Sequence, residues 1–130
     1  MNAKIPPRNR QQTGIALLEV LVAILIFSFG ILGLIGLQAR AITFSTDAED
    51  RNRAAMLANE AATLMWLNSS LTVPEASLTP WKARVAKALA SGQGEVVIDG
   101  SAADVSITWR APSKPASDPP ARLVTRVVLP

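Results

Sequence analysis

The hydrophobic residues of this chain are concentrated in one long stretch near its start. Across residues 15–37 the only charged side chain is Glu19, and the only other clearly polar side chain is Ser28. A helix of about 23 residues rises roughly 35 Å, whereas the hydrocarbon core of a bilayer is about 30 Å thick. Residues 15–37 therefore predict a helix long enough to span a membrane.

After Leu37 the hydrophobic pattern changes from continuous to periodic. Apolar residues now recur every three or four positions, which places them on one face of an amphipathic helix. These residues are Ala54, Leu57, Ala58, Ala61, Leu64 and Met65. The other faces carry Asp47, Glu49, Asp50, Arg51, Arg53 and Glu60. We interpret these charges as a solvated helix surface and not as catalytic groups. No strong helix breaker lies between Leu37 and Asn68, so the pattern predicts one helix of about fifty residues from near Ile15.

A second, shorter helix is predicted over residues 80–91. Thr79 is a candidate N-cap, and Pro80 suits the first helical position because its missing N–H needs no partner there. One face of this helix carries Trp81, Val85, Ala88 and Leu89. We interpret Trp81 as a core residue that covers the sheet, in preference to a ligand platform.

The last third of the chain is rich in β-branched residues. Residues 95–99, 104–110 and 122–129 predict strands, and the short GSAA connection makes the first two an antiparallel hairpin. In the second strand Val105, Ile107 and Trp109 share one face, the pattern of a half-buried strand. The proline-rich residues 111–121 predict an irregular surface loop. These elements predict one domain of the α+β class, in which a long helix packs on a small antiparallel sheet.

Charge and composition exclude several classes of function. The formal net charge is +3, from 13 basic and 10 acidic residues. Lys4, Arg8 and Arg10 precede Gly14, so the rest of the chain is formally neutral and no nucleic-acid partner is expected. The chain lacks cysteine and histidine, and it has no paired carboxylates or glycine-rich phosphate loop. We therefore predict no enzymatic activity, no catalytic residue, no metal site and no cofactor.

The charges around the apolar segment predict its orientation. Three basic residues precede Gly14, and only Arg40 follows closely after Leu37. Because basic residues collect on the cytoplasmic side of a first span, the N-terminus is expected in the cytoplasm. Residues 38–130 are then expected on the other side of the membrane.

Two ordinary interpretations of the N-terminal region remain open at this point. A secretory signal peptide fits the basic start and a cleavage site at Ala39-Arg40-Ala41, but the apolar segment exceeds the usual 7–15 or so residues. A plain membrane anchor fits the length, but it does not account for Glu19, because a charge inside a span is costly unless it is paired or near the interface.

Residues 14–20, with the sequence GIALLEV, resemble the class III signal of type IV pilins and pseudopilins. That family has a short basic leader, a glycine, an apolar residue and a glutamate at the fifth mature position. The resemblance implies that a prepilin peptidase removes residues 1–14 by cutting between Gly14 and Ile15, and that it methylates the new amine of Ile15. Ile15 departs from the usual phenylalanine, although the family tolerates other apolar residues.

The same resemblance implies a role for Glu19 in subunit assembly. In such filaments the apolar helices bundle away from water, where a carboxylate and the N-terminal amine of a neighbouring subunit can neutralise each other. Pairing would also select one stagger of the helices, because a shifted helix would bury both charges unpaired.

Gly30, Gly33 and Gly36 follow one another at three-residue spacing in the apolar segment. Small residues permit close helix approach or local bending, but glycine is also simply common in membrane helices, and both interpretations stay open. Major pilins usually have a proline in this region. Gly36 is the nearest equivalent here, which makes these glycines candidate helix-weakening positions in a filament.

The resemblance extends beyond the signal to the PilV-type minor pilins, the type IV pilus modification proteins. It is carried by LLEVLVAILIFSFGILGLIGLQARA, by RNRAAMLANEAATLMWLN, and by WKARV followed by GEVVI and VSITWR. It implies a type IV pilin-like fold, with residues 15–37 in the membrane or filament core and 38–130 as a periplasmic domain. Its implied partners are other minor pilins, the major pilin, the prepilin peptidase and the bacterial inner membrane before assembly. The absence of cysteine departs from major pilins that have a disulfide-closed loop.

The function implied by this resemblance is priming of pilus assembly, with a location at the pilus tip and effects on adhesion or twitching motility. A minor pseudopilin of type II secretion shares the same features and is the main alternative. A tip-located module that binds DNA or a surface is a third interpretation, and the neutral mature chain counts against DNA. A generic membrane-anchored periplasmic protein is the fourth.

Overall fold

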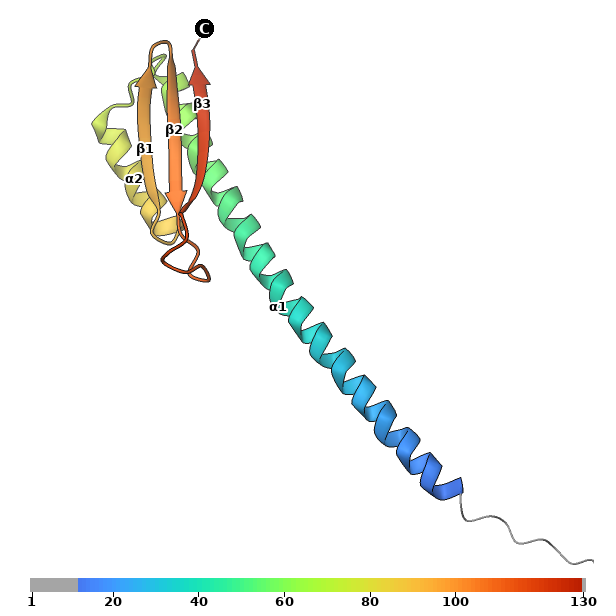
Figure 1. Cartoon of the computed structure of the whole chain (residues 1–130). Helices are drawn as coiled ribbons and strands as arrows, with labels where there is room; N and C mark the ends of the chain where they lie inside the picture. The colour runs from blue at the N-terminus through green and yellow to red at the C-terminus, as the bar shows by residue number, and fades with distance from the viewer. Residues whose placement is uncertain (1–11, 130) are drawn as a thin grey trace, which may run out of the picture. The chain divides into compact units, whose positions relative to one another are not determined.

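The computed structural model of the protein describes residues 12–129, so most of the expected leader lies outside the described residues. The elements are α1 (Gln12–Leu67), α2 (Glu75–Ala88), β1 (Gln93–Asp99), β2 (Ala102–Trp109) and β3 (Ala121–Val128) (Figure 1). The chain divides into two compact units, one ending at Ile42 and the other starting at Thr43. Each unit is described by itself below.

The first unit consists of the apolar part of α1. The helix begins at Gln12, three residues before the expected start, and it is unbroken through all three glycines of the apolar segment. The hydroxyl of Ser28 donates a hydrogen bond to the carbonyl oxygen of Ile24 at 2.7 Å. This local bond satisfies the one hydroxyl within an otherwise apolar segment.

The second unit is built on a three-stranded antiparallel sheet with strand order β1-β2-β3. In the register, Val96 lies opposite Val105, and Val105 lies opposite Thr125. The predicted hairpin is thus confirmed as β1 and β2, and each strand begins one or two residues before the expected position. Figure 1 shows α2 and the C-terminal part of α1 on the same face of this sheet.

The core lies between that face of the sheet and the two helices. α1 contributes a row of small or flexible residues to this core, and β2 contributes the residues that point toward the helices. The fully buried members include Ala54, Ala58, Ala61, Met65, Val105 and Ile107, each at most 1% exposed. Alanine on the inner face of α1 lets the helix approach the sheet closely, because little side-chain volume separates the backbones. The predicted apolar faces of the long helix and of the second strand are confirmed.

Trp81 joins three elements of this core. It is fully buried, and its indole Nε1–H donates a hydrogen bond to the carbonyl oxygen of Leu57 at 2.8 Å. Its ring packs against Gly94 of β1, where an added Cβ would lie 2.6 Å from Cη2 of Trp81. The interpretation of Trp81 as a core residue covering the sheet is confirmed.

The predicted start of the second helix is wrong. α2 begins at Glu75 and not at residue 80, and Pro80 lies inside the helix. Thr79 is not an N-cap, because its hydroxyl donates to Oε1 of Glu75 at 2.8 Å within the helix. Pro74 precedes the helix, and its carbonyl oxygen accepts hydrogen bonds from Ser77 and Leu78. Pro80 deprives the helix of a single backbone bond, and the packing of Leu78 against the core favours the added turn.

The proline-rich loop between β2 and β3 is more ordered than its sequence predicts. Nη1 of Arg110 lies 3.1, 2.8 and 2.7 Å from the carbonyl oxygens of Pro115, Ala116 and Asp118. Backbone bonds from Lys114 to Ala111 and from Asp118 to Pro115 close two turns within the loop. One guanidinium therefore organises a segment that has no regular secondary structure.

Candidate functional site

Three of the predicted site residues, Gly14, Ile15 and Glu19, lie in the first turns of α1. The helix continues through Gly14 and Ile15, and all three residues are exposed. Residues four apart share a helix face, and they are separated by about 6 Å along the axis. Glu19 is therefore one turn from the position at which the expected cut would create an amine.

Glu19 is the charged group of the apolar segment, and its carboxylate is not neutralised locally. Within residues 12–129 it makes no hydrogen bond or ion pair. The Ser28 hydroxyl can donate a hydrogen bond to a carbonyl of the preceding turn. The Glu19 carboxylate can only accept hydrogen bonds, and the helical N–H groups around it already donate to backbone carbonyls. The side chain is thus available to a cation that comes from outside the described residues.

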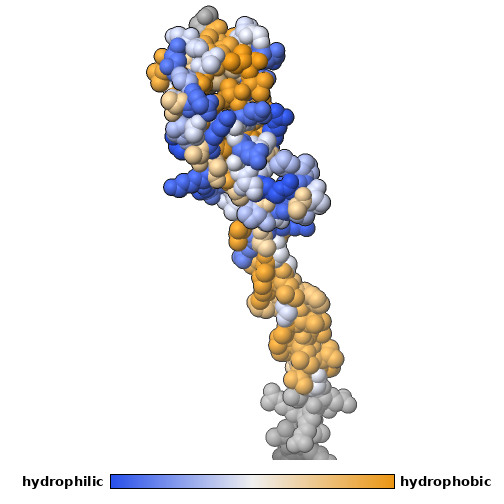
Figure 2. All heavy atoms as spheres, turned by 90° about the vertical axis from the view of Figure 1, so that its left-hand side faces the viewer, coloured by the Kyte–Doolittle hydropathy of each residue, from blue (hydrophilic) through white to orange (hydrophobic). Residues whose placement is uncertain are grey.

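The side chains around Glu19 have no cover within the chain. The large hydrophobic residues of the segment 15–37 are between 43% and 70% exposed, and Figure 2 shows them covering the surface of this segment on the face in view. Among the described residues, α1 is the helix long and apolar enough to cross a membrane. A contiguous apolar surface of this extent requires lipid or protein around it.

The three glycines of this segment face open space. An added Cβ at Gly30, Gly33 or Gly36 would meet nothing within 4 Å apart from neighbouring parts of the same helix. The structure of the single chain therefore imposes no steric need for glycine at these positions. Their predicted role as helix-weakening positions stays a prediction about a filament.

The charged residues of the second unit mainly join its elements. Arg84 of α2 forms an ion pair with Glu60 of α1, and Arg126 of β3 lies 2.8 Å from Asp99 and 3.5 Å from Asp104. These side chains are all more than one third exposed, so each pair contributes at most about 1 kcal/mol. No group of three carboxylates suited to a metal ion occurs among residues 12–129.

Sequence reasoning missed the roles of Gly94 and Arg110 in the second unit, and it placed Trp109 on the inner face of its strand without indicating the pocket beside it. Gly94 accommodates the ring of Trp81, Arg110 binds the loop carbonyls, and Trp109 lies beside a small pocket. The steric need for Gly94 arises from a contact between distant segments, and the partners of Arg110 are main-chain oxygens of a loop. Neither kind of contact leaves a periodic signal in the sequence.

Comparison with known proteins bears on the N-terminal site. Residues 9–35 match the family model described as the prokaryotic N-terminal methylation motif, and the match spans Gly14, Ile15 and Glu19. No curated protein and no solved structure matches the chain. The motif and the long apolar helix fit a membrane-anchored protein of the pilin type. Together with the short second helix and the antiparallel sheet, they support a type IV pilin-like or pseudopilin protein.

Proposed function

We propose that this protein is a minor pilin that takes part in priming the assembly of a type IV pilus. The observation that carries the proposal is the motif of residues 9–35 on an apolar helix whose side chains have no cover within the chain. Such a helix can be held by lipid before assembly and by other subunits afterwards. In this proposal the N-terminus faces the cytoplasm, and residues 38–130 lie in the periplasm until the protein enters the pilus.

The proposed maturation begins with prepilin peptidase. The enzyme cuts between Gly14 and Ile15, removes a leader that contains three basic residues, and methylates the new amine. The product keeps a cation at Ile15 and an anion at Glu19, one turn apart on the same helix. In a helix bundle, the amine of one subunit pairs with the Glu19 carboxylate of a neighbour, where low dielectric strengthens the attraction.

Mass measurement of the protein isolated from its native membrane tests the maturation step. We expect a chain that lacks residues 1–14 and carries one additional methyl group on Ile15. An uncut chain, or a chain that begins after Ala41, would overturn the proposal in favour of a plain anchor or a secretory signal peptide.

The Gly14→Ala variant separates recognition by the peptidase from effects on structure. A Cβ at Gly14 would meet nothing within 4 Å apart from nearby parts of its own helix, and alanine favours the helix. The variant should insert in the membrane like the wild type and remain uncut. Normal processing of Gly14→Ala would contradict the assignment of the cleavage site.

The chain lacks cysteine, which favours a minor pilin over a major pilin with a disulfide-closed loop. The proposed partners are accordingly other minor pilins and the major pilin, with a position at the tip that affects adhesion or twitching motility. Surface pili and twitching should be lost or reduced when the gene is deleted. Normal pili in that strain would contradict this role.

A minor pseudopilin of type II secretion is the second candidate, because the motif of residues 9–35 supports it equally. The two candidates differ in the assembly that the subunit joins, which is a type IV pilus for the pilin and a type II secretion system for the pseudopilin. Loss of protein secretion with normal pili in the deletion strain would favour the pseudopilin, and the opposite result would favour the pilin.

A further inference from the structure

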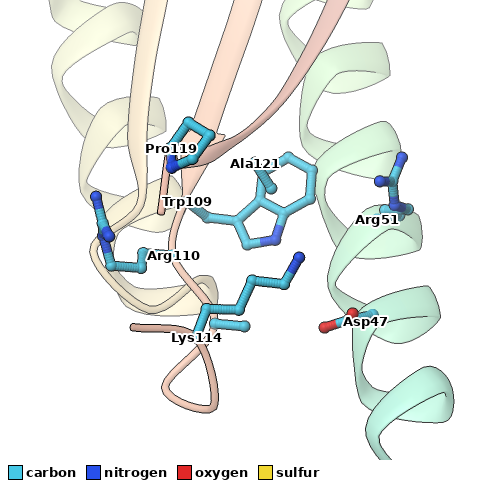
Figure 3. A pocket seen from close by; sticks show the side chains of 8 residues that line it. Asp47, Arg51, Trp109, Arg110, Lys114, Pro119 and Ala121 are labelled. Carbon is cyan, nitrogen blue, oxygen red and sulfur yellow. The ribbon is translucent and has the colours of Figure 1, made fainter. Parts of the chain in front are cut away.

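A small pocket lies where the end of β2 and the proline-rich loop face α1 within the second unit. It is lined by Asp47 and Arg51 of α1, by Trp109 and Arg110, and by Ala111, Lys114, Pro119 and Ala121. Figure 3 shows the Lys114 side chain extending beneath the indole of Trp109, with Asp47 and Arg51 on α1 across from it. None of these residues belongs to the N-terminal assembly site.

Trp109 is the unusual member of this group. Its side chain belongs to a residue only 3% exposed, yet its indole Nε1–H has no acceptor among residues 12–129. By contrast, the fully buried Trp81 donates to a backbone carbonyl, as buried indoles usually do. In the described residues every side-chain nitrogen that is shut off from solvent has a partner, so the unpartnered Trp109 nitrogen keeps some solvent exposure, and Figure 3 shows it on the Lys114 side of the indole. A preformed donor thus points into a hollow that a ligand can enter.

The charge of the pocket favours an anion. Arg51 and Lys114 are cationic, and neither forms an ion pair within residues 12–129. Arg110 adds a third cation, but its Nη1 is bonded to the loop carbonyls. Hydrogen bonds to neutral carbonyls leave the charge of Arg110 in place, so three cations against the single anion Asp47 give the lining a net charge of +2. This positive charge attracts an anion, and the single negative charge of a carboxylate is within what it can balance.

The size of the pocket restricts the ligand further. The hollow has a volume of about 20 Å³, which is room for about one water-sized group by the criterion of about 10–15 Å³ for one water, so it admits one oxygen of a ligand and leaves the rest of the ligand at its mouth. A carboxylate has two oxygens that can accept bonds from several donors at once, and charged acceptors form stronger hydrogen bonds than neutral ones.

We propose that this pocket binds a single carboxylate group, with the Trp109 Nε1–H donating to one oxygen and Arg51 and Lys114 balancing the charge. Two sources share this chemistry, namely an acidic side chain of a neighbouring protein subunit and a free small carboxylate. The proposal does not depend on the cleavage or on Glu19, and it would hold equally for a pilin and for a pseudopilin.

The test uses the full chain in zwitterionic detergent micelles, with ¹⁵N-labelled tryptophan observed by NMR. Trp66→Phe and Trp109→Phe assign the indole signals, leaving Trp81 by elimination. Sodium acetate at pH 7 should shift the Trp109 signal saturably, and sodium chloride at the same ionic strength should shift it much less. The signals of Trp66 and Trp81 should stay in place.

Two substitutions should act in opposite directions, which loss of folding cannot produce. Lys114→Gln removes a cation, and it should raise the acetate concentration for half-saturation by about tenfold. Asp47→Asn removes the repelling charge, and it should lower that concentration by roughly threefold. Lys82→Gln, at an exposed position of α2, is the matched control and should leave the titration unchanged.

Blocked tripeptides distinguish the two sources of the carboxylate. If Gly-Glu-Gly shifts the Trp109 signal and Gly-Gln-Gly does not, the site accepts an acidic side chain of a protein partner. If only acetate acts, the site takes a free small carboxylate. The proposal is overturned if acetate leaves the Trp109 signal in place, if chloride is equally effective, or if Lys114→Gln and Asp47→Asn change the titration in the same direction.

Discussion

At the scale of single residues, the second unit depends on a close contact between Trp81 and Gly94. The indole touches α1 through its bond to Leu57 and touches β1 where the strand has no side chain. Gly94 does not have a positive φ, so conformational freedom is not what requires glycine there. The requirement is space, because any Cβ at this position would overlap the ring.

Gly94→Ala should therefore destabilise the protein by about 1–3 kcal/mol, because the core must shift to admit one methyl group. Thermal unfolding monitored by tryptophan fluorescence in micelles measures the effect. Gly33→Ala is the control, since its Cβ would meet nothing within 4 Å beyond nearby parts of its own helix and alanine has the higher helix propensity. Equal unfolding temperatures for Gly94→Ala and the wild type would contradict the proposed need for space.

At the scale of elements, the contrast between α1 and α2 explains what sequence reasoning can achieve. The buried face of α1 follows from spacings of three and four, because Ala54, Ala58 and Ala61 repeat the helical period. The strands are equally regular, and Val105 and Ile107 of β2 alternate as expected. The start of α2 could not be predicted, because Pro80 is a helix breaker by its local chemistry. The packing of the turn before Pro80 against the core outweighs the preference of proline against a position inside a helix.

The loop between β2 and β3 provides an element-scale prediction. Arg110→Gln shortens the side chain and removes its charge, so the carbonyls of Pro115, Ala116 and Asp118 lose their common donor. Hydrogen exchange at the amides of Lys114 and Asp118, which close the two loop turns, should accelerate about tenfold or more.

The matched control for this loop experiment is Arg122→Gln. Arg122 lies on the exposed face of β3, and within residues 12–129 it forms no ion pair. Its substitution should leave exchange in the loop unchanged. If both variants accelerate exchange equally, the effect is one of net charge and not of the bonds made by Arg110.

At the scale of the whole molecule, the apolar segment and the core of the second unit differ in whether the chain itself covers their apolar side chains. The core buries its apolar residues within the chain, whereas the segment 15–37 leaves them exposed. The proposed function connects the two, because assembly supplies the cover that the single chain lacks. The N-terminal methylation motif could be recognised from sequence because it is short and contiguous. The Trp109 pocket could not, because its members come from α1, β2 and a loop.

Glu19→Ala tests the proposed pairing in the assembled state. Membrane insertion should be unchanged, because the substitution makes the span more apolar. The amount of this subunit in sheared filaments should fall by at least about tenfold, because the amine of a neighbour would be buried without its partner. Immunoblots of the membrane and filament fractions measure both quantities.

Glu19→Gln is the control for side-chain shape in that experiment. It keeps the size and polarity of the side chain and removes only its charge, so the pairing hypothesis expects a defect similar to that of Glu19→Ala. Normal incorporation of Glu19→Gln would show that charge is not what Glu19 contributes.

The position of Arg110 has a consequence for the conditions in which the loop keeps its shape. Converging carbonyl oxygens are the ligands that hard cations such as Ca²⁺ prefer. Here a covalently attached guanidinium supplies the positive charge, so the loop carries its own counter-ion. The folded loop should accordingly keep its shape whatever the concentration of calcium in the surrounding solution.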